Sequence, residues 1–211
     1  MKKIYFVRHG ETDGNVGGFR QGPEQPLNDQ GRKQAVLLAE RIAHLKIDKV
    51  FVSSMARAQE TAEIILAPTA HTPEVSDLFR ELKDPTSVCS ADAASADHEA
   101  IARFRTQKEL NVEDETWHFD DEENTAEFLV RVRKVIDFLS AQTEENILVV
   151  SHGHMIRYVA GHVVTGGEYS LREAYNFNRR FTTSNTGITV FLVDGQDWKL
   201  FTWNDHAHFA E

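Results

Sequence analysis

The sequence is poor in cysteine and in long apolar stretches. Among its 211 residues Cys89 is the only cysteine, which excludes an intrachain disulfide and is typical of proteins in a reducing compartment. No apolar stretch approaches the roughly 18–20 residues that a membrane helix needs. The apolar run before Arg8 is four residues long, too short for a signal peptide. We therefore expect a cytoplasmic protein that does not bind membranes.

Basic residues are also scarce, and this narrows the class of ligand. Lys and Arg number 23 against 33 Asp and Glu, which gives a formal net charge of −10 at pH 7. A protein that binds nucleic acid or an anionic membrane needs a basic face, so neither is expected as a partner. A small anionic ligand is compatible with this charge, because a few local arginines can dominate a pocket.

The sequence does contain an ordinary globular composition, with 41% hydrophobic and 27% charged residues, and alternating strand-like and helix-like segments. It shows no repeat and no clear interdomain linker. A long loop rich in Gly, Asn and Gln is predicted over 10–26. Strands are predicted at 3–7, 48–52, 75–82, 146–150, 187–193 and 198–203. Helices are predicted from a cap at Asn28 or Asp29 to about 45, then over 58–66, 97–109, 125–139, 155–164 and from 169.

This alternation predicts an α/β fold with three layers, α/β/α, around a mostly parallel central sheet. We expect a single domain over 1–211 with a helical and acidic insertion around 83–124. Within it, the acidic run 113–123 is interpreted as a solvated loop pinned by Trp117 and Phe119, with a substrate lid as the alternative. Ligands of such sheets bind beyond the carboxyl ends of the strands.

Charged and titratable side chains gather at those predicted strand ends. Arg8 and His9 follow the first strand, Arg57 the second, Glu81 the third and His152 the fourth. Arginine offers planar, bidentate donors to phosphate, neutral imidazole can attack phosphorus, and a carboxylic acid can protonate a leaving oxygen. Each residue alone is more often structural than functional, but their shared placement predicts phosphoryl-transfer chemistry.

The surroundings of the two histidines fit the same chemistry. Gly10 and Gly153 adjoin them, and the missing side chains would let a phosphate approach closely. A helix that begins near His154 would point its N–H groups at the anion. Five further side chains could shape the substrate side of the pocket: Phe19, Arg20, Tyr158, Phe177 and Arg180. Most aromatic residues of this kind, however, belong to a hydrophobic core.

Together these motifs resemble the histidine phosphatase superfamily, the phosphoglycerate-mutase-like clan. The resemblance covers nearly the whole chain in the expected order. The matching segments are Arg8-His9-Gly10-Glu11-Thr12 with Asn15, Pro26-Leu27-Asn28-Asp29-Gln30-Gly31, Ser53-Ser54-Met55-Ala56-Arg57-Ala58, Glu60-Thr61-Ala62, Glu81 and Ser151-His152-Gly153.

The resemblance implies a phosphoglycerate-mutase-like fold and a role for each matching residue. His9 is expected to be the phosphorylated nucleophile and Glu81 the proton donor. No metal or other cofactor is implied. The phosphate pocket is expected to consist of Arg8, Asn15, Arg57, His152 and Gly153.

The implied activity is that of a metal-independent, histidine acid-type phosphatase acting on a small phosphate ester. A cofactor-dependent phosphoglycerate mutase is the main alternative, and a non-catalytic phosphate-binding module is a third. The stretch Leu82-Lys83-Asp84-Pro85-Thr86-Ser87 replaces the Gly-x-x-Glu-Gly type of classical mutases, and the chain is shorter than theirs. A mutase also needs extra basic residues over the pocket, whereas the candidate cover, 90–123, is acidic.

His9 must be neutral on its attacking nitrogen, and like-charge repulsion from the arginines would lower its pKa. We expect the other ring nitrogen to donate to a backbone carbonyl, which would fix the tautomer.

Two further expectations concern metals and assembly. The pairs His152/His154 and His206/His208 have ligand-like spacing, but no Cys pair or carboxylate stands at a fixed offset, so no metal is predicted. An exposed edge strand near 198–203 is compatible with a homodimer.

Overall fold

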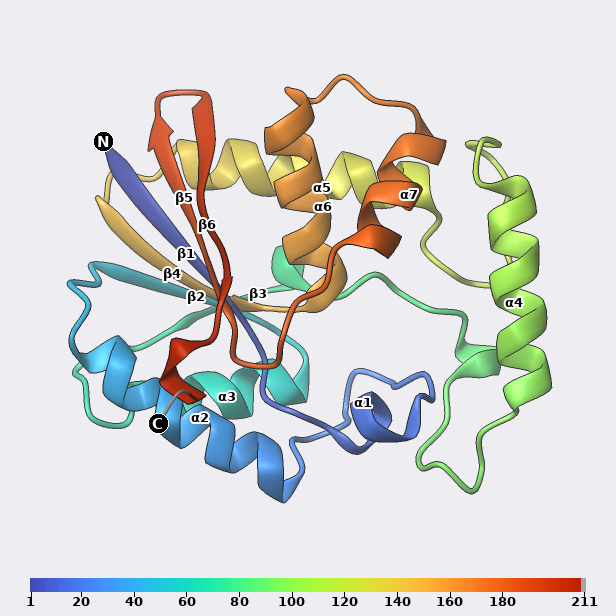
Figure 1. Ribbon diagram of the computed structural model, residues 1–211, viewed down its shortest axis with the longest axis horizontal. Helices are drawn as coiled ribbons and strands as arrows, with labels where there is room; N and C mark the ends of the chain where they lie inside the picture. Colours follow the sequence, from blue (N-terminus) through green and yellow to red (C-terminus); the bar gives the residue numbers. More distant parts are fainter. Residues whose placement is uncertain (210–211) are drawn as a thin grey trace.

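A central six-stranded sheet organises the computed structural model, which describes residues 1–209 (Figure 1). The last two residues of the predicted domain therefore lie outside the described residues. The strand order is β3-β2-β4-β1-β5-β6. The β1–β4, β2–β4 and β2–β3 pairs are parallel, and the β1–β5 and β5–β6 pairs are antiparallel. The strands are β1 (Lys2–Arg8), β2 (Lys49–Ser53), β3 (Glu74–Ser76), β4 (Asn146–Ser151), β5 (Ile188–Asp194) and β6 (Asp197–Asp205).

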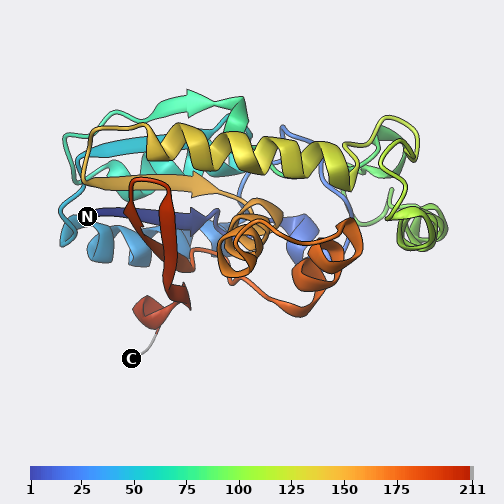
Figure 2. The same ribbon diagram turned by 90° about the horizontal axis from the view of Figure 1, so that it is seen from above.

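Helices cover both faces of this sheet, which confirms the predicted three-layer α/β/α fold. In Figures 1 and 2, α2 and α3 lie against one face, and α5 and α6 against the other. The helices are α1 (Asp13–Gly17), α2 (Asp29–Ala43), α3 (Ala56–Leu66), α4 (His98–Asn111), α5 (Thr125–Ser140), α6 (Gly153–Thr165) and α7 (Leu171–Arg180). Short 3₁₀ turns are η1 (Asp77–Phe79), η2 (Thr86–Val88) and η3 (Ala207–Phe209). None of the helices among residues 1–209 is long and apolar enough to span a membrane.

Local signals set the helix boundaries. Asn28 caps α2 as predicted, since its Oδ1 accepts the N–H of Gly31 at 2.7 Å. Asn124 and Glu127 form a capping box at the start of α5. The third helix ends at Leu66, just before Pro68.

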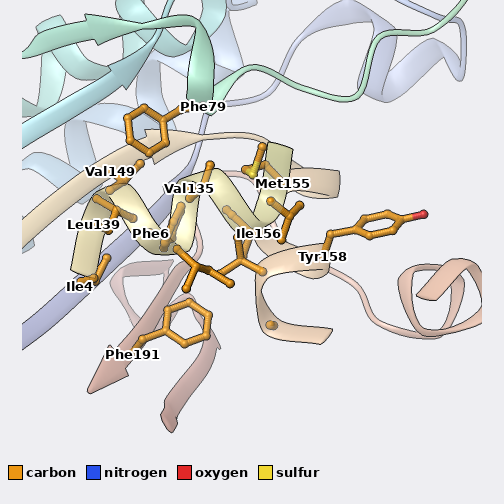
Figure 3. Packing of buried hydrophobic residues seen from close by; sticks show 14 of the residues in the cluster. Ile4, Phe6, Phe79, Val135, Leu139, Val149, Met155, Ile156, Tyr158 and Phe191 are labelled. Atoms are coloured by element: carbon orange, nitrogen blue, oxygen red, sulfur yellow. The ribbon is translucent and has the colours of Figure 1, made fainter. Parts of the chain in front are cut away.

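Two hydrophobic cores hold β1 rigidly. Ile4 and Phe6 pack with Phe191, α5 and α6 on one face of the sheet, as Figure 3 shows. Val7 lies in the second core with α2 and α3. Alternate side chains of a strand point to opposite faces, so burial on both sides explains the continuous apolar run before Arg8. That run mounts Arg8 and the following residue on a strand with little freedom to move.

The predicted strand 75–82 is wrong beyond Ser76. Only β3 is a strand, and Ser76 Oγ accepts the N–H of Leu78 at 3.2 Å to start the turn η1. Glu81 consequently lies in an irregular segment beyond the sheet.

The predicted loop 10–26 also contains a short helix, α1. It begins with a capping box in which Thr12 and Asn15 satisfy each other's backbone N–H groups. This five-residue helix has too few apolar residues to produce a recognisable helical period.

Helix α4 lies beyond the carboxyl ends of the strands in both views (Figures 1 and 2). It packs through Phe104 against Phe119, with ring centroids 5.2 Å apart. The acidic run 113–123 is therefore pinned by Phe119, as interpreted, but it is not simply solvated. Glu122 is buried and accepts from Lys108 Nζ at 2.5 Å, so the run ties α4 to its connecting loop.

Candidate active site

The strand ends bring most of the predicted site residues around one cavity of about 350 Å³. Those that line it are Arg8, His9, Asn15, Arg57, Glu81 and Gly153. His152 is not among the lining residues. It is completely buried behind the cavity, with its ring centroid 5.1 Å from that of His9.

The ring of His9 is held in one orientation. Its Nδ1 lies 2.7 Å from the carbonyl oxygen of Gly10, which confirms the predicted backbone contact. Since a carbonyl can only accept, Nδ1 carries the proton and Nε2 is left with its lone pair. Burial lowers the pKa of His9 well below its usual value, and the charges of Arg57, His152 and Arg8 lower it further. The imidazole is therefore neutral at pH 7.

Each of the two cavity arginines, Arg8 and Arg57, is held by a hydrogen bond from its Nη1 atom to a backbone carbonyl. Arg8 Nη1 donates to the carbonyl of Thr183 at 2.6 Å, and Arg57 Nη1 donates to that of Gly22 at 3.1 Å. The Nε atoms of both guanidinium groups are buried without a partner among residues 1–209. Buried donors without acceptors are costly, and an anion in the cavity would remove that cost. Burial lowers the pKa of Arg8 to about 10, so the group remains charged at neutral pH.

Ser53, at the end of β2, fixes the ring of His152. Its Oγ lies 2.7 Å from His152 Nε2 and accepts the N–H of Met55 at 3.3 Å. The hydrogen bond to Ser53 occupies Nε2 and leaves the other ring nitrogen, Nδ1, outside this contact. That Nδ1 is buried and unpaired within residues 1–209. Ser53 belongs to a matching motif, but no pattern in the sequence predicted this contact.

Glu81 faces the start of α6. Its carboxylate accepts the N–H of Leu82 at 3.0 Å and that of His154 at 3.1 Å, and His154 Nδ1 lies 3.3 Å away. The N–H expected to point at the phosphate thus binds Glu81 instead. Burial alone would raise the pKa of Glu81, but the charge and hydrogen bond of His154, followed by the charges of His152 and Arg157, hold it well below its usual value.

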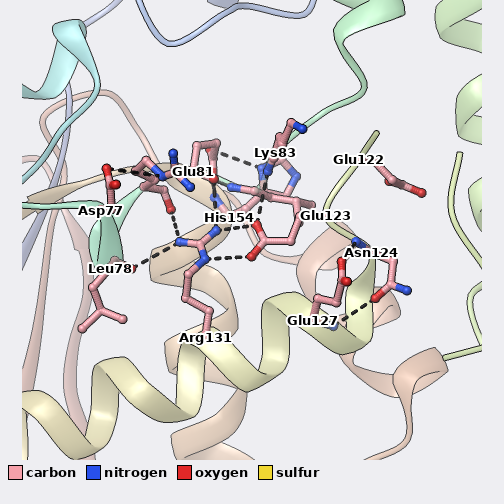
Figure 4. Close-up of polar contacts among 12 residues, drawn as sticks. Asp77, Leu78, Glu81, Lys83, Glu122, Glu123, Asn124, Glu127, Arg131 and His154 are labelled. Carbon is pink, nitrogen blue, oxygen red and sulfur yellow. Dashed lines mark hydrogen bonds and ion pairs between the residues drawn. The ribbon is translucent and has the colours of Figure 1, made fainter. Parts of the chain in front are cut away.

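Arg131 of α5 anchors the segment that carries Glu81 (Figure 4). Its guanidinium donates to the carbonyl oxygens of Leu78, Arg80 and Glu81 at 3.2, 2.7 and 3.1 Å. Its charge is matched by Glu123, whose carboxylate oxygens lie 2.8 and 2.6 Å from the guanidinium. The irregular segment that follows β3 is thereby held in a fixed position. Arg131 was missed, because a polar residue on an amphipathic helix reads as a solvent-facing one.

The two glycines next to the histidines serve packing as well as access. A Cβ on Gly10 would lie 2.5 Å from the carbonyl oxygen of Gly31, so this glycine lets the loop pack against the start of α2. Packing against Gly31, and not the expected room for a phosphate, is therefore the main reason for a glycine at position 10. A Cβ on Gly153 would meet Arg157 at 3.1 Å and Thr183 at 3.2 Å.

Asn185 also positions the loop that follows β1 and was not predicted. Its Nδ2 donates to the carbonyl of His9 and to Asn15 Oδ1, both at 3.0 Å. The next residue, Thr186, is buried and has a φ of 57°, a strained conformation for a β-branched residue. The polar run before β5 offered no pattern by which to find either residue.

The other sequence candidates divide between two cavities. Phe19 and Arg20 line the cavity with His9. Tyr158, Phe177 and Arg180 line a separate cavity of about 370 Å³ between α6 and α7.

The histidine pairs weighed as metal ligands have other partners. His206 Nδ1 lies 2.9 Å from the carbonyl of Asn204, and His208 Nε2 lies 2.9 Å from the hydroxyl of Thr186. No group of three or more His, Cys, Asp or Glu side chains within residues 1–209 is arranged to hold a metal ion.

Comparison with known proteins yields one family. A family model described as histidine phosphatase superfamily (branch 1) matches residues 4–206. Phosphoglycerate mutase-like protein 4 of Arabidopsis thaliana is 31% identical, over 99% of this chain and 87% of its own length. A metal-independent phosphoserine phosphatase of the same plant is 27% identical, over 100% of this chain and 84% of its own.

A solved structure shares the fold. A mutant phosphoserine phosphatase from Entamoeba histolytica, in complex with phosphoserine, superposes with a TM-score of 0.79 at 23% identity. The match covers 99% of this chain and 100% of that one.

Proposed function

The chain belongs to the histidine phosphatase superfamily, branch 1, and on this premise we propose that it is a metal-independent phosphomonoesterase that acts through a phosphohistidine on His9. Relatives named as phosphatases support an enzyme of this type. The observation on which the proposal chiefly depends is the state of His9: a buried neutral imidazole, with Nδ1 bound to a carbonyl, lining a cavity with two arginines.

In the first step Nε2 of His9 attacks phosphorus and forms a P–N bond, while the P–O bond to the leaving group breaks. Arg8 and Arg57 neutralise the phosphoryl oxygens as charge develops. The leaving oxygen takes a proton from Glu81 and departs as an alcohol.

In the second step the carboxylate of Glu81 takes a proton from water as its oxygen attacks phosphorus. The P–N bond breaks, inorganic phosphate is released and His9 regains its lone pair. Glu81 must be protonated for the first step, although His154 holds its pKa low in the free protein. A phosphate dianion nearby would raise that pKa, so substrate binding itself favours the acid form.

Labelling tests the intermediate. The protein is mixed with a ³²P-labelled phosphate ester and quenched in alkali, in which a P–N bond survives. We expect label on His9 in the unmodified chain and none in His9→Ala, whose turnover should fall by about 10³-fold or more. His44→Ala, an exposed histidine at the end of α2, is the control and should keep both label and turnover.

Other outcomes would redirect the assignment. Label retained in His9→Ala would place the nucleophile elsewhere. Phosphate binding without label and without turnover would favour the non-catalytic module.

A phosphoglycerate mutase is the second candidate, because Lys83 and Arg105 line the cavity and supply basic residues that a mutase needs over the pocket. An assay of phosphoglycerate isomerisation that depends on 2,3-bisphosphoglycerate separates the two activities.

A further inference from the structure

The cavity around His9 is far more basic than the chain as a whole. Six of its lining side chains are basic and two are acidic, in a protein whose net charge is −10. The proposed chemistry uses only Arg8 and Arg57 on the phosphate, which leaves four basic groups over the rest of the cavity. The basic side chains are Arg8, Arg20, Arg57, Lys83, Arg105 and Arg157, and the acidic ones are Glu81 and Asp84.

Most of the remaining basic groups already have partners within the protein, but Arg105 does not. Lys83 Nζ donates to Asp121 at 2.9 Å, and Arg157 Nε donates to Asn178 at 2.8 Å. Arg105 lies exposed on α4, lines the cavity, and forms no ion pair with any residue among 1–209. Its charge is available to a ligand.

Arg20 is held in place beside the same cavity. Its guanidinium lies 3.2 Å from Asp84, and its carbonyl accepts the N–H of Ser90 at 2.9 Å, next to an isolated bridge with Cys89. Its Nε is buried without a partner among residues 1–209. Arg20 therefore keeps a donor for a ligand, on a group whose position is already fixed.

These two arginines mark the side of the cavity toward which a leaving group can extend. Both also line a neighbouring cavity of about 320 Å³, whereas Arg8, His9 and Arg57 line only the first. A phosphate bound at His9 thus places the rest of its ester in the direction of Arg20 and Arg105.

We propose that the leaving group of the substrate carries a second anionic group, a carboxylate or a second phosphate, and that Arg105 with Arg20 binds it. This inference rests on the proposed phosphatase function and names its substrate class. Guanidinium groups form strong charge-assisted hydrogen bonds with either anion. A neutral group in the same place would leave the charge of Arg105 without a partner.

Three esters on one three-carbon chain test this preference: 3-hydroxypropyl phosphate, 3-phosphonooxypropanoate and propane-1,3-diyl bisphosphate. The leaving group is neutral in the first ester and anionic in the other two. We expect kcat/KM for at least one ester with an anionic leaving group to exceed that of the ester with the neutral one by about tenfold or more. Which anionic ester is preferred distinguishes a carboxylate from a second phosphate.

Arg105→Met should reduce this anionic-to-neutral ratio about tenfold. Arg103→Met is the matched control, since Arg103 is exposed on the same helix but does not line the cavity, and it should leave the ratio unchanged.

Equal rates on all three esters together with hydrolysis of p-nitrophenyl phosphate would overturn this inference and leave the phosphatase function standing. A ratio unaffected by Arg105→Met would overturn the assignment of Arg105. Failure to hydrolyse any ester would overturn the proposed function and this inference with it.

Discussion

At the scale of single residues, the surroundings of His9, the proposed nucleophile, and Glu81, the proposed acid, hold both side chains in their deprotonated forms in the free protein. Burial keeps His9 neutral, while contacts with His154 keep Glu81 ionised in the free protein. In the proposed mechanism the nucleophile is therefore ready before substrate arrives, whereas the acid acquires its proton only when substrate is bound. The acid step is therefore the one most sensitive to the leaving group.

Glu81→Gln should consequently impair substrates with poor leaving groups most. We expect kcat/KM on alkyl phosphates to fall by about 10²-fold or more, with a much smaller loss on p-nitrophenyl phosphate, whose leaving group needs no proton. Because an acid must be protonated, kcat/KM of the unmodified chain on alkyl phosphates should also fall as pH rises. Glu63→Gln, an exposed carboxylate on α3, serves as the control. Equal losses on both ester types would identify another residue as the acid.

At the scale of elements, the position of Glu81 depends on α5 rather than on the sheet. The third strand ends at Ser76, and Arg131 fixes the backbone beyond it through three carbonyl groups. Helix α5 therefore supplies a positioning residue for the site, although it contributes no side chain to the cavity lining.

Arg131→Gln should resemble the loss of Glu81 itself. We expect the loss of kcat/KM to be greater on alkyl phosphates than on p-nitrophenyl phosphate, because a displaced Glu81 no longer reaches the leaving oxygen. In a Glu81→Gln background the same change should have little further effect on the alkyl esters, since the two residues act as one unit. Arg133→Gln, exposed two residues along α5, controls for general loss of charge. Losses that simply add in the double variant would show that Arg131 is only structural.

The same elements show how far sequence patterns extend. Arg8, His9 and Arg57 line one cavity, as their positions after buried strands indicated, whereas Glu81 lines it on a segment held by α5. Apolar patterns predict the first three positions because burial on both faces of a strand produces a continuous apolar run. They fail for α1, which is stabilised by caps rather than by an apolar face.

Net charge was a poor guide to the segment over the pocket. The cover 90–123 is acidic in sum, yet its buried Glu122 pairs with Lys108 and its Asp121 with Lys83, while Arg105 lines the cavity. The direction of each side chain depends on tertiary contacts between α4 and the loops, and composition does not contain that information.

At the scale of the whole molecule, the site is a set of buried groups that the fold keeps uncharged or paired at a cost. His9 and His152 are buried at the centre, next to guanidinium groups. The folded protein is most stable when both of these imidazoles are neutral. Stability of the whole chain should therefore depend on pH through the same histidines that the proposed mechanism uses.

Acidification below pH 6.5 should destabilise the fold. Burial lowers the pKa of His9, His152 and His154 below the ordinary value of 6.5, so in this range the unfolded chain binds protons that the folded chain does not. The free energy of unfolding then decreases as pH falls, by up to about 1.4 kcal/mol per pH unit for each histidine. Exposed His118, whose pKa is raised by its hydrogen bond to Glu127, acts weakly in the opposite direction.

Thermal unfolding measured at intervals from pH 7.5 to 5 tests this coupling. We expect Tm to decline below pH 6.5, and to decline less steeply in His9→Phe, which keeps an aromatic ring of similar size without a titrating nitrogen. His44→Phe, at an exposed position, should retain the slope of the unmodified chain. A Tm that is constant or rises on acidification would mean that these imidazoles are charged in the folded protein. Nucleophilic attack by His9 at neutral pH would then lose its physical basis.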